Sequence, residues 1–327
     1  MRPISQSRPA AAYFGPLSSV LRNSPMSILL LGRDGQVGWQ LQRSLAPHGP
    51  LTALARGDCD LADLDALRSA LRRVAPQVIV NAAAYTAVDK AESEPDLARR
   101  INAEVPGLLA AEAARSGALL VHYSTDYVFD GEKEGPYRED DPTGPASVYG
   151  RTKREGEEAI AEAGAQALIF RTSWVFGARG GNFVKTILRL ARERDSLNVV
   201  ADQTGSPTPA ALIATVSGLA LAAVRGGGLL APGEARLYHL AAAAPVSWHA
   251  FAQRIVALAS AQGFVLKLAP EAIRAITTAE YPTPARRPRN SRLDCGRLEA
   301  DLGLLMPHWQ PYLERALQLL ALKQNGY

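Results

Sequence analysis

The fold of this chain is decided by residues 27–45, which read Ser-Ile-Leu-Leu-Leu-Gly-Arg-Asp-Gly-Gln-Val-Gly-Trp-Gln-Leu-Gln-Arg-Ser-Leu. The apolar run Ile28–Leu31 predicts a buried strand, because four successive apolar residues suit a strand that is covered on both faces. Val37, Leu41 and Leu45 recur at helical spacing and predict an amphipathic helix. The stretch therefore predicts a strand, a turn and a helix in direct succession.

Three glycines punctuate this turn at intervals of three residues. In a dinucleotide-binding turn, the first glycine permits the tight turn, the second lets the backbone approach a pyrophosphate, and the third lets the helix pack closely on the strand. The free N–H groups at the helix N-terminus also attract phosphate. The spacing is G-x-x-G-x-x-G, which is also compatible with a plain turn, but the strand before it and the helix after it favour a nucleotide site. The residues expected to contact the dinucleotide are Gly32, Asp34, Gly35, Gln36, Val37 and Gly38.

Length and composition indicate a soluble globular protein. At roughly 150 residues per domain, its 327 residues correspond to about two domains. The net charge of +4 is small and owes much to an arginine cluster near Arg286, so the charge does not indicate a nucleic-acid partner. No apolar run reaches the length of about 18 residues expected of a membrane span. Cys59 and Cys295 lie far apart, which indicates neither a disulfide framework nor a zinc site and fits a cytoplasmic protein.

Residues 1–25 are polar and basic, contain four prolines and lack the apolar segment of a secretory signal. We expect a disordered extension, with Met26 as an alternative start; a transit peptide is the minor alternative. Strands and helices alternate most clearly over 26–175, which predicts an α/β dinucleotide-binding domain with a Rossmann-type doubly wound parallel sheet. Residues 176–327 are expected to form mostly a smaller C-terminal substrate-binding lobe, with segments near 197–245 returning to the first domain.

The second predicted strand, residues 51–55, is followed by Arg56, where an acidic residue would bind the ribose of NAD. An arginine there can accompany a 2′-phosphate, so NADPH is the favoured cofactor, with NADH open and a solvated loop residue as the other interpretation of Arg56. Asp60 and Leu61, which follow shortly afterwards, are also expected to contact the cofactor. A third strand, residues 78–81, leads into small residues that leave room for a flat ligand, although an ordinary loop is the alternative. These small residues are Ala82, Ala83 and Ala84.

Hydroxyl side chains follow a further apolar strand, residues 118–123, where Ser124 and Thr125 stand at the predicted ligand edge of the sheet. The same pair could also cap a turn. The next predicted helix opens at residue 147 and carries Tyr149 and Lys153. Because these two are four residues apart, their side chains share one helical face.

At this point the residues resemble a known family, the extended short-chain dehydrogenases/reductases. Longer strings resemble the branch of that family which reduces dTDP-4-dehydrorhamnose to dTDP-L-rhamnose, and the resemblance covers roughly residue 26 to the C-terminus. The general motifs are Gly32-x-x-Gly35-x-x-Gly38, Asn81-Ala82-Ala83-Ala84, Ser124-Thr125 and Tyr149-x-x-x-Lys153. The branch-specific strings are residues 35–39, 84–89, 124–131 and 171–176.

The resemblance implies NAD(P)H-dependent reduction of the 4-keto group of a dTDP-6-deoxy sugar, in the supply of rhamnose for surface polysaccharide. Such a reaction needs a proton donor to the ketone oxygen, and the family assigns this task to Tyr149. A tyrosine has a pKa of about 10, and a nearby cation lowers it. We therefore expect Lys153 to lower the pKa of Tyr149, and by resemblance to bind the nicotinamide ribose as well. Thr125 is expected to hydrogen-bond the same oxygen.

By the same resemblance, the sugar-nucleotide pocket is lined by Thr86, Asp126, Tyr127 and Trp174. The alternative interpretations are that Trp174 belongs to the core and that Tyr127 packs under a loop. The arginine-rich run 285–291 resembles a C-terminal segment of these reductases, where Arg289 is expected to pair with the substrate pyrophosphate. A solvated basic loop is the alternative.

Some relatives carry a glutamate after the tryptophan of the glycine turn, and it helps to hold magnesium at a dimer interface. Here Gln40 stands in that place and is a poorer ligand for a hard cation, so we expect no metal and leave monomer and homodimer open. The five histidines have no ligand-like spacing and are expected to be structural or exposed: His48, His122, His239, His249 and His308.

Two other functions stay open at this stage. One is a non-catalytic regulatory subunit resembling that of methionine adenosyltransferase, against which the proton-donor set of Thr125, Tyr149 and Lys153 argues. The other is a nucleotide-sugar epimerase or dehydratase of the same fold. A 4,6-dehydratase would carry an Asp-Glu pair after the strand-end threonine, whereas Thr125 precedes Asp126 and Tyr127.

Overall fold

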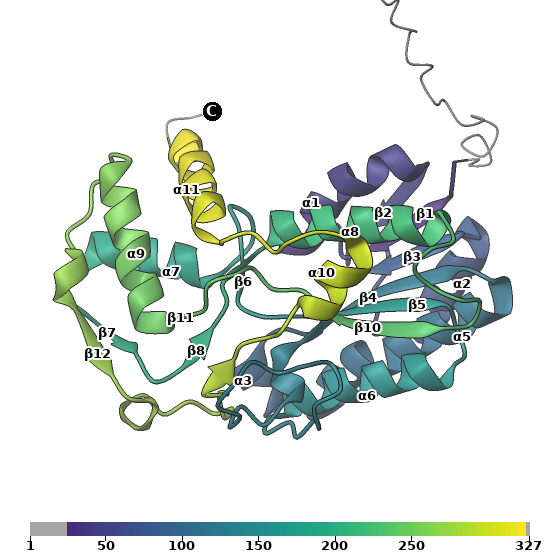
Figure 1. Cartoon of the computed structure of the whole chain (residues 1–327), viewed down its shortest axis with the longest axis horizontal. Coiled ribbons are helices and arrows are strands. Elements are labelled where there is room, and N and C mark those ends of the chain that lie inside the picture. Colours follow the sequence, from purple (N-terminus) through teal and green to yellow (C-terminus); the bar gives the residue numbers. More distant parts are fainter. Residues whose placement is uncertain (1–24, 325–327) are drawn as a thin grey trace, which may run out of the picture.

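A six-stranded parallel sheet forms the core of the larger lobe of the computed structural model, which describes residues 25–324; this lobe is on the right in Figure 1. The extension predicted for residues 1–25 lies, apart from Pro25, outside the described residues. The strand order is β10-β5-β4-β3-β1-β2, and every neighbouring pair in the sheet is parallel. The strands are β1 (Ile28–Leu31), β2 (Leu51–Leu54), β3 (Val78–Asn81), β4 (Leu119–Thr125), β5 (Ala167–Thr172) and β10 (Ala235–His239).

Helices cover both faces of this sheet, which explains why β1 is apolar at every position. Side chains alternate along a strand, so Ile28 and Leu30 face one core cluster while Leu29 and Leu31 face the other. The first cluster contains helices α1 (Gln36–Leu45) and α8 (Ala210–Arg225), and the second contains α2 (Leu64–Val74), α5 (Val105–Ser116) and α6 (Val148–Glu162). The predicted doubly wound α/β fold is therefore confirmed.

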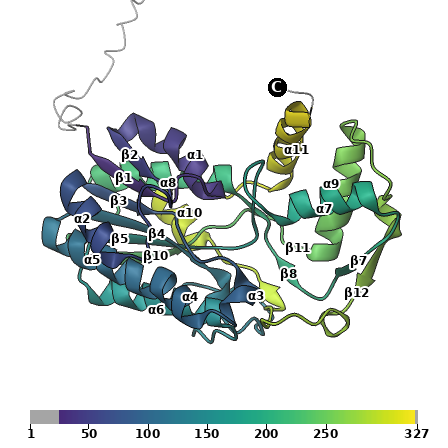
Figure 2. The same cartoon turned by 180° about the vertical axis from the view of Figure 1, so that it is seen from behind.

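A smaller lobe lies beside the lobe that contains this sheet (Figure 2). Its helices are α7 (Phe183–Glu193), α9 (Trp248–Ala261) and α11 (Gln310–Gln324). Its short strands form three small sheets, β11-β8-β13, β12-β7 and β6-β9. The strand bounds are β6 (Val175–Phe176), β7 (Leu197–Val200), β8 (Thr204–Gly205), β9 (Thr208–Pro209), β11 (Val246–Ser247), β12 (Ile273–Ile276) and β13 (Asn290–Ser291). The apolar pattern of residues 197–200 predicts β7, but the sequence predicts none of the other strands. Five of these have only two residues and so carry almost no periodicity, and the four-residue β12 is not indicated either.

Two segments that follow residue 197 lie against the main sheet. Strand β10 pairs with β5, and α8 packs beside α1. The remaining helices are α3 (Val88–Ala91), α4 (Pro95–Arg99) and α10 (Gly296–Leu302). Short turns of helix are η2 (Ala46–His48), η4 (Asp126–Val128), η5 (Pro270–Ala272) and η6 (Thr278–Glu280). Within residues 25–324, no helix combines the length and apolar character needed to cross a membrane.

Residues 89–116 have a helical sequence pattern in which Pro95 and Pro106 predict boundaries or a kink, and the structure has an irregularity at each proline. Pro95 begins α4, and a π-helical turn, η3 (Arg100–Glu104), joins α4 to α5 just before Pro106. Proline has no N–H to donate to the carbonyl four residues earlier, so that carbonyl, on Asn102, is released from the helical ladder. It lies where a Cβ on Gly156 would be only 2.2 Å away, so the wider turn and the glycine together let α6 approach closely.

The chain leaves β1 towards β2 on one side, while β3 lies on the other side of β1. In doubly wound sheets, the crevice at such a switch point, outside the carboxyl ends of the strands, is where ligands bind. The glycine turn follows β1 directly and so lies at this crevice.

Candidate active site

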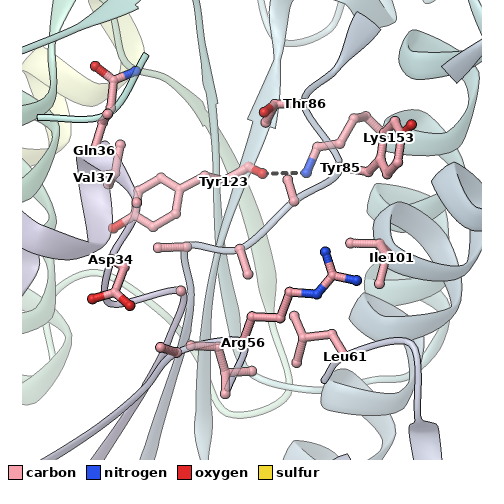
Figure 3. A pocket seen from close by; sticks show the side chains of 18 of the residues that line it. Asp34, Gln36, Val37, Arg56, Leu61, Tyr85, Thr86, Ile101, Tyr123 and Lys153 are labelled. Carbon is pink, nitrogen blue, oxygen red and sulfur yellow. Dashed lines mark hydrogen bonds between the residues drawn. The ribbon is translucent and has the colours of Figure 1, made fainter. Parts of the chain in front are cut away.

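A cavity of about 760 Å³ opens at the carboxyl ends of the central strands (Figure 3). Its walls come from the loops after β1, β2 and β3, from β4 and from α6. All but one of the residues predicted to bind the cofactor line it: Gly32, Asp34, Gly35, Gln36, Val37, Arg56, Asp60, Leu61, Ala82, Ala83, Ala84, Tyr149 and Lys153. Thr86, predicted to contact substrate, lines it as well.

The glycine turn has the shape that a bound dinucleotide requires. Gly32 has φ +82°, and a Cβ there would lie 2.9 Å from the backbone nitrogen of Ala83. Gly38, the one predicted residue outside the lining, lies beneath the turn, where a Cβ would be 2.0 Å from the Gly32 carbonyl oxygen. Helix α1 begins after Gly35 with no side-chain cap, which leaves its first N–H groups for an anion. These residues fit a dinucleotide pyrophosphate.

We expect Gly38→Ala to weaken NADPH binding by about 5- to 150-fold, the range that corresponds to an overpacking cost of about 1–3 kcal/mol. The added methyl group would push the turn and helix α1 apart and so displace the N–H groups. Titration calorimetry with NADPH measures the change. Gly57→Ala is the matched control, because a Cβ at Gly57 meets no atom within 4 Å; equal affinities for both variants would contradict the role of Gly38.

Arg56 extends into the cavity from the end of β2 (Figure 3). Its side chain is 83% exposed and its guanidinium is 3.7 Å from the Asp60 carboxylate, an ion pair of little strength. Arg33, in the glycine turn itself, is instead held by Asp58 at 3.1 Å and by the Ala53 carbonyl at 3.0 Å. Arg56 is therefore the more available of the two cations for a ligand phosphate.

Tyr149 lies in the first turn of α6, whose N-cap is Ser147, and the Ser147 hydroxyl accepts a hydrogen bond from the Gly150 N–H at 3.1 Å. Burial raises the pKa of the Tyr149 phenol to about 12, and the adjacent Thr125 hydroxyl offsets part of this rise. The phenol is consequently protonated at neutral pH. Thr125 is the last residue of β4, and its hydroxyl donates to an Asp126 carboxylate oxygen at 3.1 Å.

The expectation that Lys153 lowers the pKa of Tyr149 is wrong for this structure. The Lys153 amine lies 2.6 Å from the Tyr123 carbonyl oxygen and 3.1 Å from Nε2 of His122, so it is engaged by β4 and does not act on the phenol (Figure 3). Burial lowers the pKa of Lys153 to about 8, although Glu157 opposes this. Four-residue spacing places two side chains on one helical face, but it does not determine which groups their ends contact.

Asp126 and Tyr127 lie directly beyond Tyr149 on the side of the smaller lobe. The Asp126 carboxyl is buried, and burial raises its pKa to about 6. Tyr127 packs edge-to-face on Tyr149, with ring centroids 5.5 Å apart. Thr125, Asp126 and Tyr127 therefore form one cluster around the Tyr149 ring, adjoining the cavity.

Trp174 and Arg289 contact other parts of the smaller lobe. Trp174 has φ +48° and stacks on Trp248 with ring centroids 3.4 Å apart. Arg289 has an exposed side chain, and its carbonyl accepts from the Thr204 N–H at 2.8 Å. In the same run, Arg287 lies beside the Tyr127 hydroxyl and pairs with Asp89 at 2.6 Å. The sequence gives no sign of this role for Arg287, because nothing in an Arg-Arg-Pro-Arg run marks which arginine faces inward.

Asn102 is another residue of the site that the sequence did not indicate. Its side chain accepts from the Tyr85 N–H at 2.9 Å and donates to the Tyr85 carbonyl at 3.1 Å, which fixes the loop that carries Thr86. The only feature of the sequence that marks the neighbourhood of Asn102 is Pro106, four residues later. In the described part of the chain, no three His, Cys, Asp or Glu side chains are gathered as they would be around a metal ion.

The glycine turn at the head of a parallel sheet, with Tyr149 and the buried Lys153 beside it, defines a Rossmann-type oxidoreductase of the extended short-chain dehydrogenase/reductase class. The family model described as RmlD substrate binding domain matches residues 26–322. The dTDP-4-dehydrorhamnose reductase of Burkholderia thailandensis is 49% identical over 288 residues, which cover 87% of this chain and 96% of that protein. The chain belongs to the family of dTDP-4-dehydrorhamnose reductases.

Solved structures of similar proteins agree with this assignment. The dTDP-4-dehydrorhamnose reductase of Clostridium acetobutylicum has a TM-score of 0.81 and 36% identity, covering 90% of this chain and 100% of that one. That of Bacillus anthracis, solved in complex with NADP, has a TM-score of 0.79 and 32% identity, covering 90% and 99%.

Proposed function

We infer that the chain catalyses the NADPH-dependent reduction of the 4-keto group of dTDP-4-dehydrorhamnose, which yields dTDP-L-rhamnose. The observation that carries this inference is the protonated Tyr149 phenol beside Thr125, at the edge of a cavity headed by the glycine turn. Family membership indicates which reaction is catalysed. The Tyr149 phenol would be the proton donor that this reaction needs.

We assign the long cavity to the cofactor. The N-terminus of α1 and the turn of Gly32 and Gly35 would hold the pyrophosphate, and Arg56 would hold the 2′-phosphate. Ala82 to Ala84 would face the flat rings, and Lys153 would bind the nicotinamide ribose. When bound, the reduced nicotinamide supplies the hydride.

Tyr149 then acts as the general acid towards the ketone oxygen. Because the pKa of its phenol is raised, Tyr149 keeps its proton until negative charge develops on the ketone oxygen. Transfer of the proton then neutralises that charge as it forms. Thr125 would turn its hydroxyl hydrogen from the Asp126 carboxylate to the same oxygen, and would so orient the ketone and stabilise the alkoxide.

The cluster beyond Tyr149 is the proposed sugar-nucleotide site. Thr86, Asp126 and Tyr127 would contact the dTDP-sugar near the reacting carbon, with Trp174 and Arg289 further into the smaller lobe. Arg287 is a second candidate for the pyrophosphate, because it lies beside Tyr127. We propose that the enzyme works as a monomer or homodimer without a bridging metal, since Gln40 offers a neutral side chain where a carboxylate would be needed.

The other functions considered fit the site less well. A purely regulatory subunit has no need of a phenol paired with a threonine hydroxyl at the edge of the cavity. A 4,6-dehydratase needs an acid–base pair after the strand-end threonine, whereas here Tyr127 contributes a phenol whose pKa is raised by burial.

The proposal is tested by mixing purified protein with NADPH and dTDP-4-dehydrorhamnose and following the loss of nicotinamide absorbance. We expect oxidation of one NADPH per sugar, and none when dTDP-glucose replaces the keto sugar. Absence of oxidation under conditions where calorimetry shows bound NADPH would contradict the proposed reaction.

A further inference from the structure

His122 contacts Lys153 from the side that faces away from the cavity, and the proposed reaction gives this histidine no role. The ring lies in the middle of β4 and is 1% exposed. Both of its nitrogens have partners: Nδ1 is 3.1 Å from the side-chain nitrogen of Asn81, and Nε2 is 3.1 Å from the Lys153 amine. Asn81 and His122 are register partners on β3 and β4, so the sheet itself holds the two side chains together.

Asn81 determines which ring nitrogen of His122 carries the proton. The Asn81 side-chain oxygen accepts from the Ala83 N–H at 3.3 Å, which leaves its NH₂ group pointing at the ring. An NH₂ group can only donate, so Nδ1 of His122 must accept. The single hydrogen of a neutral ring is then on Nε2, facing Lys153.

This arrangement conflicts with a charged lysine. An ammonium group has three donors and no acceptor, so it would meet the Nε2–H of His122 donor to donor. A neutral amine resolves the conflict: it accepts from Nε2–H, donates one hydrogen to the Tyr123 carbonyl, and keeps one hydrogen for the cavity. A buried donor without an acceptor costs about 1–3 kcal/mol, so the network discriminates between the two states.

We propose that His122, with its tautomer fixed by Asn81, is a positioning residue that donates through Nε2–H to Lys153 and favours the neutral amine. Because it acts through a residue assigned to the cofactor, its catalytic consequence rests on the proposed function. The hydrogen-bond arrangement itself does not.

The other groups around Lys153 allow His122 to influence whether the amine is charged. Burial lowers the pKa of Lys153 and holds the pKa of His122 well below its usual value, so two adjacent cations are disfavoured. Glu157, one turn along α6, favours the ammonium, but its carboxylate is already paired with Arg171 of β5 at 2.6 Å. Three phenols also lie on or beside these elements: Tyr149 on α6, Tyr123 on β4 with its hydroxyl on Ser217, and Tyr85 after β3 with its hydroxyl on Glu94. Of the other charged residues on α6, Glu155 pairs with Arg99, and Arg154 pairs with Glu158.

The first test is nuclear magnetic resonance of the cofactor-free protein labelled with ¹⁵N-histidine and ¹³C-lysine, with signals assigned through the variants. We expect His122 to be neutral with its hydrogen on Nε2. Asn81→Asp places an acceptor opposite Nδ1 and should move the hydrogen to Nδ1. A wild-type ring with its hydrogen on Nδ1, or a cationic ring, would overturn the proposal.

The second test follows the titration of Lys153 itself in His122→Gln. The glutamine can present its carbonyl oxygen to the amine, which favours the ammonium, so the pKa of Lys153 should rise by about one unit. Val121→Ala, in the apolar core one residue earlier on β4, is the control for a merely loosened strand and should lower Tm without moving the titration.

A Lys153 titration unchanged in His122→Gln would contradict the proposal. If instead the titration shifts as expected but no turnover of dTDP-4-dehydrorhamnose is found in any variant, the proposed function fails and the hydrogen-bond role stands.

Discussion

Replacing Tyr149 with phenylalanine should lower kcat by about 10²- to 10⁴-fold, the usual contribution of a positioned general acid. The change removes only the Tyr149 hydroxyl, which would donate its proton to the ketone oxygen. The ring remains packed against Tyr127, so the affinity for NADPH should stay within about twofold of the wild type. Stopped-flow measurement of NADPH oxidation, together with calorimetry for cofactor binding, separates the two effects.

Tyr238→Phe is the matched control for this change. The Tyr238 hydroxyl donates to Asp301 at 2.6 Å, outside the proposed site, so its loss removes a buried phenol hydroxyl without touching the reaction. We expect a normal kcat for this variant. Activity in Tyr149→Phe comparable to the control would exclude Tyr149 as the proton donor.

Replacing Glu157 with alanine should lower the free energy of unfolding by about 3–5 kcal/mol, because it leaves the buried Arg171 charge without its partner. The guanidinium of Arg171 makes two parallel contacts to this carboxylate, at 2.9 Å and 2.6 Å, and both side chains are more than nine-tenths buried. The pair joins α6, which carries Tyr149 and Lys153, to strand β5. Urea denaturation followed by circular dichroism measures the loss.

The neighbouring residue on the same helix provides the control. Glu158 pairs with Arg154 at 2.8 Å, but both side chains are close to half exposed. Exposed pairs of this kind contribute about 0–1 kcal/mol, so Glu158→Ala should unfold almost as the wild type does. Equal losses in the two variants would show that burial of the Arg171–Glu157 pair does not matter.

Much of the fold could be predicted because its signals are local. The apolar run of β1, the glycines after it and the periodicity of α1 lie within one short stretch, and each depends only on neighbouring residues. The same holds for Tyr149 and Lys153, whose spacing places them on one helical face. The N-caps Ser147 and Asp63 are local features as well, because their hydrogen bonds are to residues two or three positions away.

The remainder depends on contacts between segments far apart in the sequence. Lys153 turns towards His122 and the Tyr123 carbonyl because β4 lies beneath α6, and no spacing rule within α6 encodes that direction. Arg287, and not Arg289, lies beside Tyr127, and this contact joins two segments that are far apart in the sequence. The stack of Trp174 on Trp248 likewise joins residues that are distant in sequence, so its place at the lobe could not be read from either residue alone.

The central claim is that this chain reduces C4 of the sugar with the hydrogen of NADPH, and deuterium transfer tests it most directly. The protein is incubated with NADPH deuterated at both C4 positions of the nicotinamide and with dTDP-4-dehydrorhamnose, and the sugar product is examined by mass spectrometry and proton magnetic resonance. We predict dTDP-L-rhamnose carrying one deuterium, located at C4. A product without deuterium, or with deuterium at another carbon, would contradict the account.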